Sequence, residues 1–236
     1  MVVLKFTLPD GGALQPDINR LFMAGYTGRS EEAVKRHIAE MAQKGVSPPT
    51  KTPAYHPVMP CLLSQSQKLE VCGRDTLPEV EFVIFGWQGR LFVTVGNDQY
   101  DVEMERVGEL QRSKNLAQKP ISKFAWPLED VEDHWDELQL KMYAGGILVQ
   151  SGPVSEIMRP ESLVSSASIT DGTMVFSGTV PFVAPLDDRI DTFVICLTDP
   201  VKGRALTHEF KRDVVEEKVE ATTGNRQRPV EATTAL

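Results

Sequence analysis

At residues 78–84 the sequence reads Pro78-Glu79-Val80-Glu81-Phe82-Val83-Ile84, a β-prone run with two acidic residues separated by a single residue. Residues i and i+2 of a strand face the same side, so the carboxylates of Glu79 and Glu81 are expected to converge. Two like charges held so close need a cation, and hard divalent ions take carboxylate oxygens. The run therefore predicts an oxygen-ligand metal site; the alternative is a solvated strand face.

Two further polar segments follow this run. A third carboxylate comes from Gly96-Asn97-Asp98, and a lone cation comes from Ser113-Lys114. This order is typical of an oxygen-ligand site for an ion such as Mg²⁺, which leaves positions open for water and for an oxygen-rich substrate.

The rest of the chain indicates a β-dominated α+β fold. Short apolar or alternating runs recur, with Gly, Asp and Pro between them. They lie at residues 71–72, 80–85, 91–95, 138–142, 147–149, 174–176 and 193–197. Five prolines within residues 46–60 argue against regular pairing there and predict an extended loop.

One amphipathic helix is predicted at residues 31–44. Ser30 is placed as its N-cap and Gly45 as the residue that ends it. Apolar side chains at Val34, Ile38 and Met41 lie on one face of that helix.

The same helix carries His37 and Glu40 at positions i and i+3. Their side chains project from one side, close enough for the carboxylate to orient the imidazole and make it a better general base. The alternative is a surface helix on which both are ordinary polar residues.

The composition argues against several classes of function. The chain has 236 residues and a net charge of -8, which argues against nucleic-acid binding because phosphates need a basic face. Three cysteines without metal-type spacing fit a reducing compartment better than a disulfide-stapled secreted domain. The first residues lack the pattern of a signal peptide, and no apolar stretch is long enough to cross a bilayer. We expect a cytoplasmic protein with no membrane partner.

The domain organisation is expected to be simple. Residues 1–213 are predicted to form a single domain. From residue 214 onward the chain becomes charged and then poor in large apolar residues. Residues 214–236 are therefore predicted to be a polar tail that is flexible or bridges to a second subunit.

Seven motifs follow one another between residues 24 and 185: Gly28-Arg29, His37-Ile38-Ala39-Glu40, Pro53-Ala54-Tyr55-His56-Pro57, Glu79-Val80-Glu81, Asn97-Asp98, Ser113-Lys114-Asn115 and Gly178-Thr179-Val180-Pro181. Their order resembles the fumarylacetoacetate hydrolase superfamily. Within it, the chain is most similar to an uncharacterised, mainly bacterial branch, through residues 24–29, the helix with His37, and residues 135–138 and 198–204.

The resemblance implies a fold and a metal. The fold is a mixed β-roll with a short N-terminal lid helix, residues 31–44. Glu79, Glu81 and Asp98 would hold Mg²⁺ or Mn²⁺, with Ca²⁺ as a further option. In this superfamily the metal is chelated by a 2-oxo acid or acylpyruvate and stabilises the enolate that appears when a carbon-carbon bond breaks.

The resemblance also implies roles for other side chains. Lys114 would supply positive charge to the developing oxyanion, and His37, oriented by Glu40, would activate water or move a proton. Thr179 would bind the substrate carboxylate through its hydroxyl or backbone amide, and Gln150 is a further candidate for a polar contact. Arg29 could bind a substrate carboxylate bidentately, or pair with an acidic neighbour on the surface.

The chain departs from the superfamily pattern at three places. The connection between Glu81 and Asp98 is short, so Asp101 and Glu103 are alternatives to Asp98. The spacing around Lys114 leaves Lys119 as a rival for the site lysine. The last motif is Gly-Thr-Val-Pro instead of Gly-Thr-Pro.

Three functions stay open at this point. The first is a metal-dependent hydrolase that cleaves a carbon-carbon bond in a small acidic keto compound. The second is a lyase, a decarboxylase or a hydratase, that uses the same site, because stabilising an enolate serves all of these reactions. The third is a non-catalytic binding protein that retains the fold. The relatives imply a homodimer.

Overall fold

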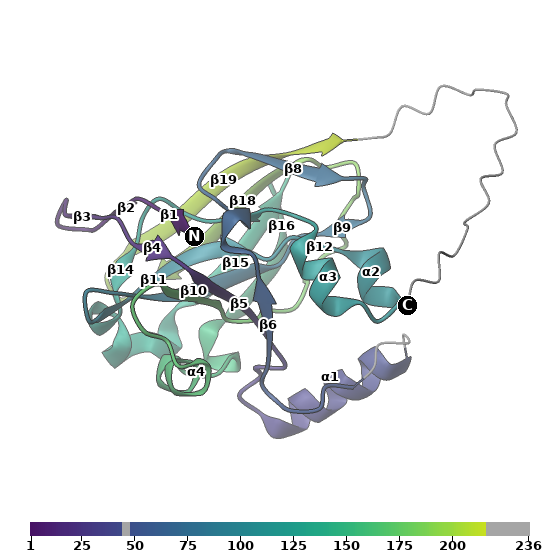
Figure 1. Ribbon diagram of the computed structural model, residues 1–236, viewed down its shortest axis with the longest axis horizontal. Coiled ribbons are helices and arrows are strands. Elements are labelled where there is room, and N and C mark those ends of the chain that lie inside the picture. The colour runs from purple at the N-terminus through teal and green to yellow at the C-terminus, as the bar shows by residue number, and fades with distance from the viewer. Residues whose placement is uncertain (44–47, 216–236) are drawn as a thin grey trace, which may run out of the picture.

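Two β-sheets form the body of the protein (Figure 1), seen in a computed structural model that describes residues 1–43 and 48–215. The larger sheet has the order β14 (Trp126–Pro127), β11 (Arg90–Asn97), β10 (Val80–Trp87), β17 (Thr173–Phe176), β5 (Arg20–Gly25) and β6 (Ala54–Val58). The second has the order β16 (Ile147–Pro153), β15 (Gln139–Ala144), β18 (Thr192–Asp199), β19 (Arg204–Val215) and β8 (Lys68–Cys72). Each sheet contains one parallel pair, β17 with β5 and β19 with β8, so both are mixed.

Shorter elements complete the fold. Four two-stranded pairs are β1 (Val2–Val3) with β4 (Asp17–Ile18), β2 (Phe6–Thr7) with β3 (Ala13–Leu14), β9 (Thr76–Leu77) with β12 (Tyr100–Asp101), and β7 (Leu63–Ser64) with β13 (Lys119–Pro120). The α-helices are α1 (Glu31–Gln43), α2 (Val102–Arg106), α3 (Leu110–Asn115) and α4 (Pro160–Ala167). The 3-10 helices are η1 (Pro60–Leu62), η2 (Leu128–Asp130), η3 (Glu132–Glu137) and η4 (Val154–Glu156).

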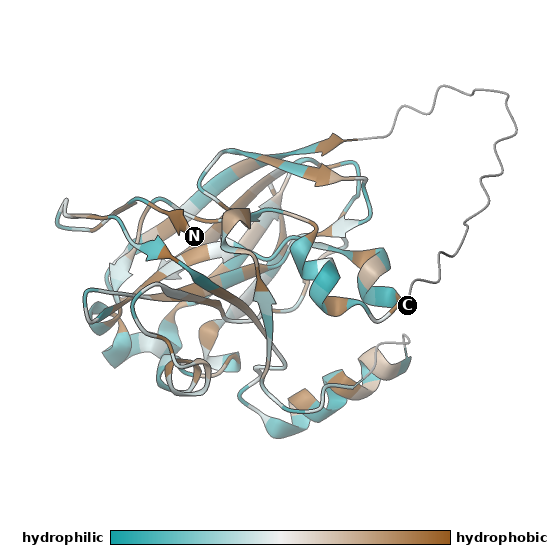
Figure 2. Cartoon of the chain, in the orientation of Figure 1, coloured by the Kyte–Doolittle hydropathy of each residue, from teal (hydrophilic) through white to brown (hydrophobic). Residues whose placement is uncertain are grey.

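Strand β10 lies between two hydrophobic cores. Phe82 and Ile84 on one face pack in the core shared with the five-stranded sheet, whereas Val83 and Phe85 on the other pack with the N-terminal strands. Successive side chains of a strand point to opposite faces, so a strand buried on both faces must be apolar almost throughout. Figure 2 shows apolar residues concentrated on the strands of the body and polar residues on the loops and helices. An acidic residue in such a strand is therefore costly unless a partner compensates its charge.

The predicted helix at residues 31–44 is present as α1, whose last described residue is Gln43; residues 44–47, including Gly45, lie outside the described part. Ser30 caps it, since its hydroxyl accepts a hydrogen bond from the Ala33 amide at 3.3 Å. No residue of α1 is fully buried, and the helix lies along the outside of the body (Figure 1).

The prediction of an unpaired loop at residues 46–60 was wrong for its second half. Residues 54–58 form β6, which pairs antiparallel with β5 and places Pro57 opposite Phe22. β6 is an edge strand, where a proline does not interrupt a ladder on its free side.

The C-terminal boundary of the ordered strands lies two residues beyond the one predicted. β19 continues through Val215, and its last residues pair with β8. The rest of the predicted tail, residues 216–236, lies outside the described residues. Among the described residues, no helix is long and apolar enough to span a membrane.

Candidate metal centre

The three predicted metal ligands meet at one end of the β10–β11 hairpin. Glu81 lies on β10, Glu79 precedes that strand, and Asp98 follows β11. The antiparallel register pairs Glu81 with Gly96, and the Asp98 amide donates to the Glu79 carbonyl oxygen at 2.8 Å. One carboxylate oxygen from each of the three residues lies within 4.8 Å of the other two. Glu81 and Asp98 are 2% and 1% exposed and so are shielded from water, whereas the Glu79 side chain is 20% exposed.

Backbone from the far half of the chain holds Glu81 in place. Its Oε2 accepts a hydrogen bond of 2.9 Å from the amide of Gly178, just beyond β17. Gly178 has φ +88°, and a Cβ there would clash with the Thr27 hydroxyl, which itself donates to the Ser177 carbonyl oxygen at 2.6 Å. Glycine is thus required on two grounds, its backbone conformation and the close approach of Thr27.

Both candidate lysines contact the centre. Lys114, on α3, places Nζ 2.6 Å from Asp98 Oδ2 and 3.5 Å from Glu79 Oε2. Lys119, on β13, places Nζ 2.9 Å from the other oxygen of Asp98 and donates to the Gln99 carbonyl oxygen. The sequence left Lys114 and Lys119 as alternatives, and the fold brings them to the same aspartate.

The three carboxylates of the cluster carry more negative charge than the neighbouring lysines neutralise. Burial raises the pKa of Glu79 to about 7, against the opposing effect of Lys114. Burial, with repulsion from Asp98 and Glu79, raises the pKa of Glu81 well above its usual value. Burial alone would also raise the pKa of Asp98, but Lys114 and Lys119 outweigh it and hold that pKa below its usual value. Three carboxylates face two ammonium groups, so a further cation would stabilise the cluster.

The donor set fits a hard divalent ion. The converging atoms are all carboxylate oxygens, which suit Mg²⁺, Mn²⁺ and Ca²⁺. The alternatives to Asp98 are engaged elsewhere: the Asp101 carboxylate caps α2 by accepting from the Met104 amide at 2.8 Å, and Glu103 pairs with Arg106.

The predicted general-base pair lies on α1, away from these carboxylates. His37 and Glu40 are exposed, and within the described residues no hydrogen bond or ion pair joins either to the cluster. The His37 ring lies 5.6 Å from that of Tyr26, centroid to centroid. His37 also acts electrostatically on Glu105 of α2, whose pKa is raised by burial and lowered in part by Lys114. Sequence reasoning missed Glu105, since no spacing pattern singles it out.

Gln150 and Thr179 brace the segment between the two glutamates. Gln150 is fully buried; its Oε1 accepts from the Val80 amide at 3.0 Å, and its Nε2 donates to Thr179 Oγ1 at 3.0 Å and to the Val180 carbonyl oxygen at 2.8 Å. The Thr179 hydroxyl donates to the Val80 carbonyl oxygen at 2.7 Å. Because Val80 separates Glu79 from Glu81, these bonds hold the backbone between the two glutamates in place.

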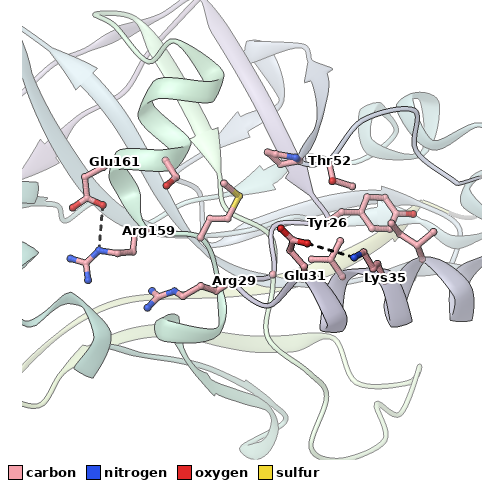
Figure 3. Close-up of a pocket in the computed structure, with 13 residues that line it drawn as sticks. Tyr26, Arg29, Glu31, Lys35, Thr52, Arg159 and Glu161 are labelled. Atoms are coloured by element: carbon pink, nitrogen blue, oxygen red, sulfur yellow. Dashed lines mark hydrogen bonds and ion pairs between the residues drawn. The ribbon is translucent and has the colours of Figure 1, made fainter.

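Arg29 is paired with an acidic neighbour. Its guanidinium binds Asp136 bidentately at 2.8 and 3.0 Å, and its Nε donates to the Ile157 carbonyl oxygen at 3.2 Å. It lines a pocket of about 650 Å³ between the start of α1 and residues 158–162. Figure 3 shows the ion pairs at this pocket, Arg159 with Glu161 and Lys35 with Glu31. None of the three carboxylates of the metal centre lines it.

A family model described as "Protein of unknown function (DUF2848)" matches residues 24–210. The chain belongs to the DUF2848 family. No curated protein matches this DUF2848 chain in sequence.

Solved structures match the DUF2848 chain over most of its length. Fumarylpyruvate hydrolase from Pseudomonas aeruginosa, in complex with Mn²⁺ and pyruvate, aligns with 91% of this chain and 97% of its own, with a TM-score of 0.63 and 14% identity. The 5-carboxymethyl-2-hydroxymuconate delta-isomerase from Mycobacterium smegmatis aligns with 88% of this chain and 84% of its own, with a TM-score of 0.61 and 15% identity. These likenesses confirm the predicted fold, a β-dominated α+β fold of the fumarylacetoacetate hydrolase type.

Proposed function

We propose that this DUF2848 protein is a divalent-metal-dependent hydrolase that cleaves a carbon-carbon bond in a small acylpyruvate or 2-oxo acid. The observation that carries the proposal is the buried cluster of Glu79, Glu81 and Asp98, whose oxygens converge within 4.8 Å. The fold likeness to a hydrolase that binds Mn²⁺ and pyruvate supports it.

In this proposal the three carboxylates hold Mg²⁺ or Mn²⁺, and Ca²⁺ also suits the donor set. The bound ion would polarise the keto oxygen of the substrate and stabilise the negative charge that develops on it. Lys114 directs its ammonium at the same oxyanion. Lys119, anchored on the Gln99 carbonyl oxygen, keeps Asp98 ionised and oriented.

The lid helix α1 supplies the proton-transfer groups. His37, oriented by Glu40, activates water or moves a proton once α1 lies over the substrate. Thr179 binds the substrate carboxylate through its backbone amide, because its hydroxyl is engaged by Val80 and Gln150. Gln150 acts through Thr179, and Arg29 acts from the neighbouring pocket if the substrate displaces Asp136.

A lyase is the second candidate, either a decarboxylase or a hydratase using the same residues. The isomerase among the similar structures carries out a different reaction on the same fold, which keeps more than one reaction open for this site. A requirement for His37 separates the hydrolase from a decarboxylase, since hydrolysis needs an activated water whereas decarboxylation does not.

We also propose that the protein is a cytoplasmic homodimer that binds a small acidic keto compound and neither nucleic acid nor membrane. Its net charge of -8 supports the part of this proposal that concerns nucleic acid. Light scattering of the full chain tests the dimer, which requires twice the mass of one chain.

The test of function is a screen of acylpyruvates, oxaloacetate and related 2-oxo acids with added Mg²⁺ or Mn²⁺. We expect metal-dependent release of pyruvate or carbon dioxide from at least one compound. Glu81→Gln removes one carboxylate charge with little change of shape and should abolish both bound metal and turnover. Equal metal content in Glu81→Gln and wild type, measured by elemental analysis, would refute the metal centre. Metal bound without turnover of any compound would favour a binding protein.

A further inference from the structure

Two lysines contact Asp98, although one would be enough to form an ion pair with it. Lys119 pairs with Oδ1 of that aspartate, and Lys114 pairs with Oδ2. The two lysines are five positions apart and come from different elements, α3 and β13. Their contacts differ in a way that assigns them different tasks.

We propose that Lys114 is a tethered cation that competes with the divalent metal for Glu79 and Asp98, and so sets the metal affinity of the centre. This inference rests on the proposed function only in assuming that the carboxylate cluster binds a metal. It concerns the lysine of this chain and does not depend on which substrate is turned over.

Position is the first argument. Lys114 Nζ contacts two of the three predicted ligands, at 2.6 Å from Asp98 Oδ2 and 3.5 Å from Glu79 Oε2. A metal ion needs the lone pairs of those oxygens at about 2.0–2.6 Å. An ammonium group on these oxygens and an ion bound to them repel each other, so a bound ion favours withdrawal of the ammonium.

Mobility is the second argument. Lys119 has a fully buried side chain and is anchored twice, on Asp98 Oδ1 and on the Gln99 carbonyl oxygen. The Lys114 side chain is 10% exposed and its Nζ lies 3.9 Å from the centroid of the Tyr100 ring. The face of an aromatic ring attracts an ammonium group. Lys114 can therefore leave the carboxylates and keep a favourable contact, whereas Lys119 cannot.

Charge is the third argument. With Lys114 in place, the buried cluster is closer to neutral before any metal arrives. A metal that enters loses part of the attraction it would have gained, because it must separate an ion pair that already exists. Once displaced, the ammonium becomes available to the substrate oxyanion, which is the role proposed for it above.

The test is the Mn²⁺ affinity of the full-length protein, measured by calorimetry at fixed ionic strength. Lys114→Met keeps the length of the side chain and removes its charge, and we expect Mn²⁺ to bind at least about tenfold more tightly than to wild type. Arg112→Met is the matched control. Arg112 lies on the same helix with its side chain 74% exposed, so its removal should change the affinity by less than about twofold.

The outcomes separate the two proposals. Unchanged or weaker Mn²⁺ binding by folded Lys114→Met would overturn the competition while leaving the metal centre intact. Absence of Mn²⁺ binding by both proteins would overturn the metal centre and the competition together. Should Lys114→Met not fold, a crystal structure of the wild-type protein with Mn²⁺ decides. Nζ beyond hydrogen-bond distance of Asp98 Oδ2 supports the inference, and Nζ still within it refutes the inference.

Discussion

The backbone amide of Gly178 contacts the carboxylate cluster through a single hydrogen bond. That amide is a hydrogen-bond donor to Glu81, and it is held by a backbone conformation, φ +88°, that other residues rarely adopt. A Cβ at this position would also meet the Thr27 hydroxyl. The orientation of the Glu81 carboxylate therefore depends on the absence of a side chain at residue 178.

We predict that Gly178→Ala destabilises the protein by about 1–3 kcal/mol and weakens Mn²⁺ binding, because the new methyl group forces the amide away from Glu81. Urea unfolding and calorimetry measure the two effects. Gly11→Ala is a matched control, since Gly11 has a similar φ of +84° but nothing within 4 Å of its Cβ position. An equal loss in both variants would show that conformation alone matters and not the contact with Thr27.

Single residues were predictable where the sequence carries a motif. The pair Glu79 and Glu81 came from local spacing and Asp98 from the resemblance, and the fold brings the oxygens of all three together. Glu105 and the amide of Gly178 were not predictable as site groups. Glu105 belongs to no spacing pattern, and the Gly178 amide reaches Glu81 only because residues 97 positions apart become neighbours. The engagement of Arg29 by Asp136 likewise spans 107 positions.

At the scale of elements, α1 lies along the outside of the body (Figure 1). It has no fully buried residue, and the side chains of His37 and Glu40 are exposed. If α1 has a catalytic role, its side chains must contact the substrate, because none of them is buried in the core.

We predict that His37→Ala leaves the free energy of unfolding within about 0.5 kcal/mol of wild type, as for other exposed positions. Hydrolytic turnover should fall by about 100-fold or more, because general-base catalysis contributes at least that much. The assay is turnover of whichever acylpyruvate the screen identifies. Arg36→Ala, one position earlier and also exposed, serves as the control. Turnover of His37→Ala at the wild-type rate would remove α1 from the mechanism or indicate the lyase reaction.

Elements were predictable where periodicity was strong. The helix at 31–44 and the strands around 80–85 and 91–95 were found because their apolar spacing is regular. β6 was missed because its prolines argue against pairing, and only its place at the sheet edge makes Pro57 acceptable. The two short helices α2 and α3 were not predicted, because neither is long enough to show a periodic pattern of apolar residues.

At the scale of the whole molecule, the cluster of Glu79, Glu81 and Asp98 costs the fold stability unless a cation compensates its charge. Burial of Glu79 and Glu81 opposes their charged forms, and Lys114 offsets this cost only in part. A ligand that binds the folded state alone shifts the unfolding equilibrium in its favour.

We predict that Mn²⁺ at about 100 times its dissociation constant raises the free energy of unfolding by about 2.7 kcal/mol. Thermal unfolding at increasing metal concentration measures this, and the midpoint should rise steadily. The same titration of Glu81→Gln should leave the midpoint unchanged. A parallel rise in both proteins would mean that Mn²⁺ binds elsewhere on the acidic surface.

The position of β17 has a consequence for how the protein is made. This strand lies between β10 and β5, and the turn after it brings the Gly178 amide to Glu81. A ribosome therefore releases the acidic hairpin long before it delivers the strand that joins the hairpin to the N-terminal segment. Until then the nascent chain carries an incomplete sheet, and β10 and β5 are joined only after Phe176 has been made.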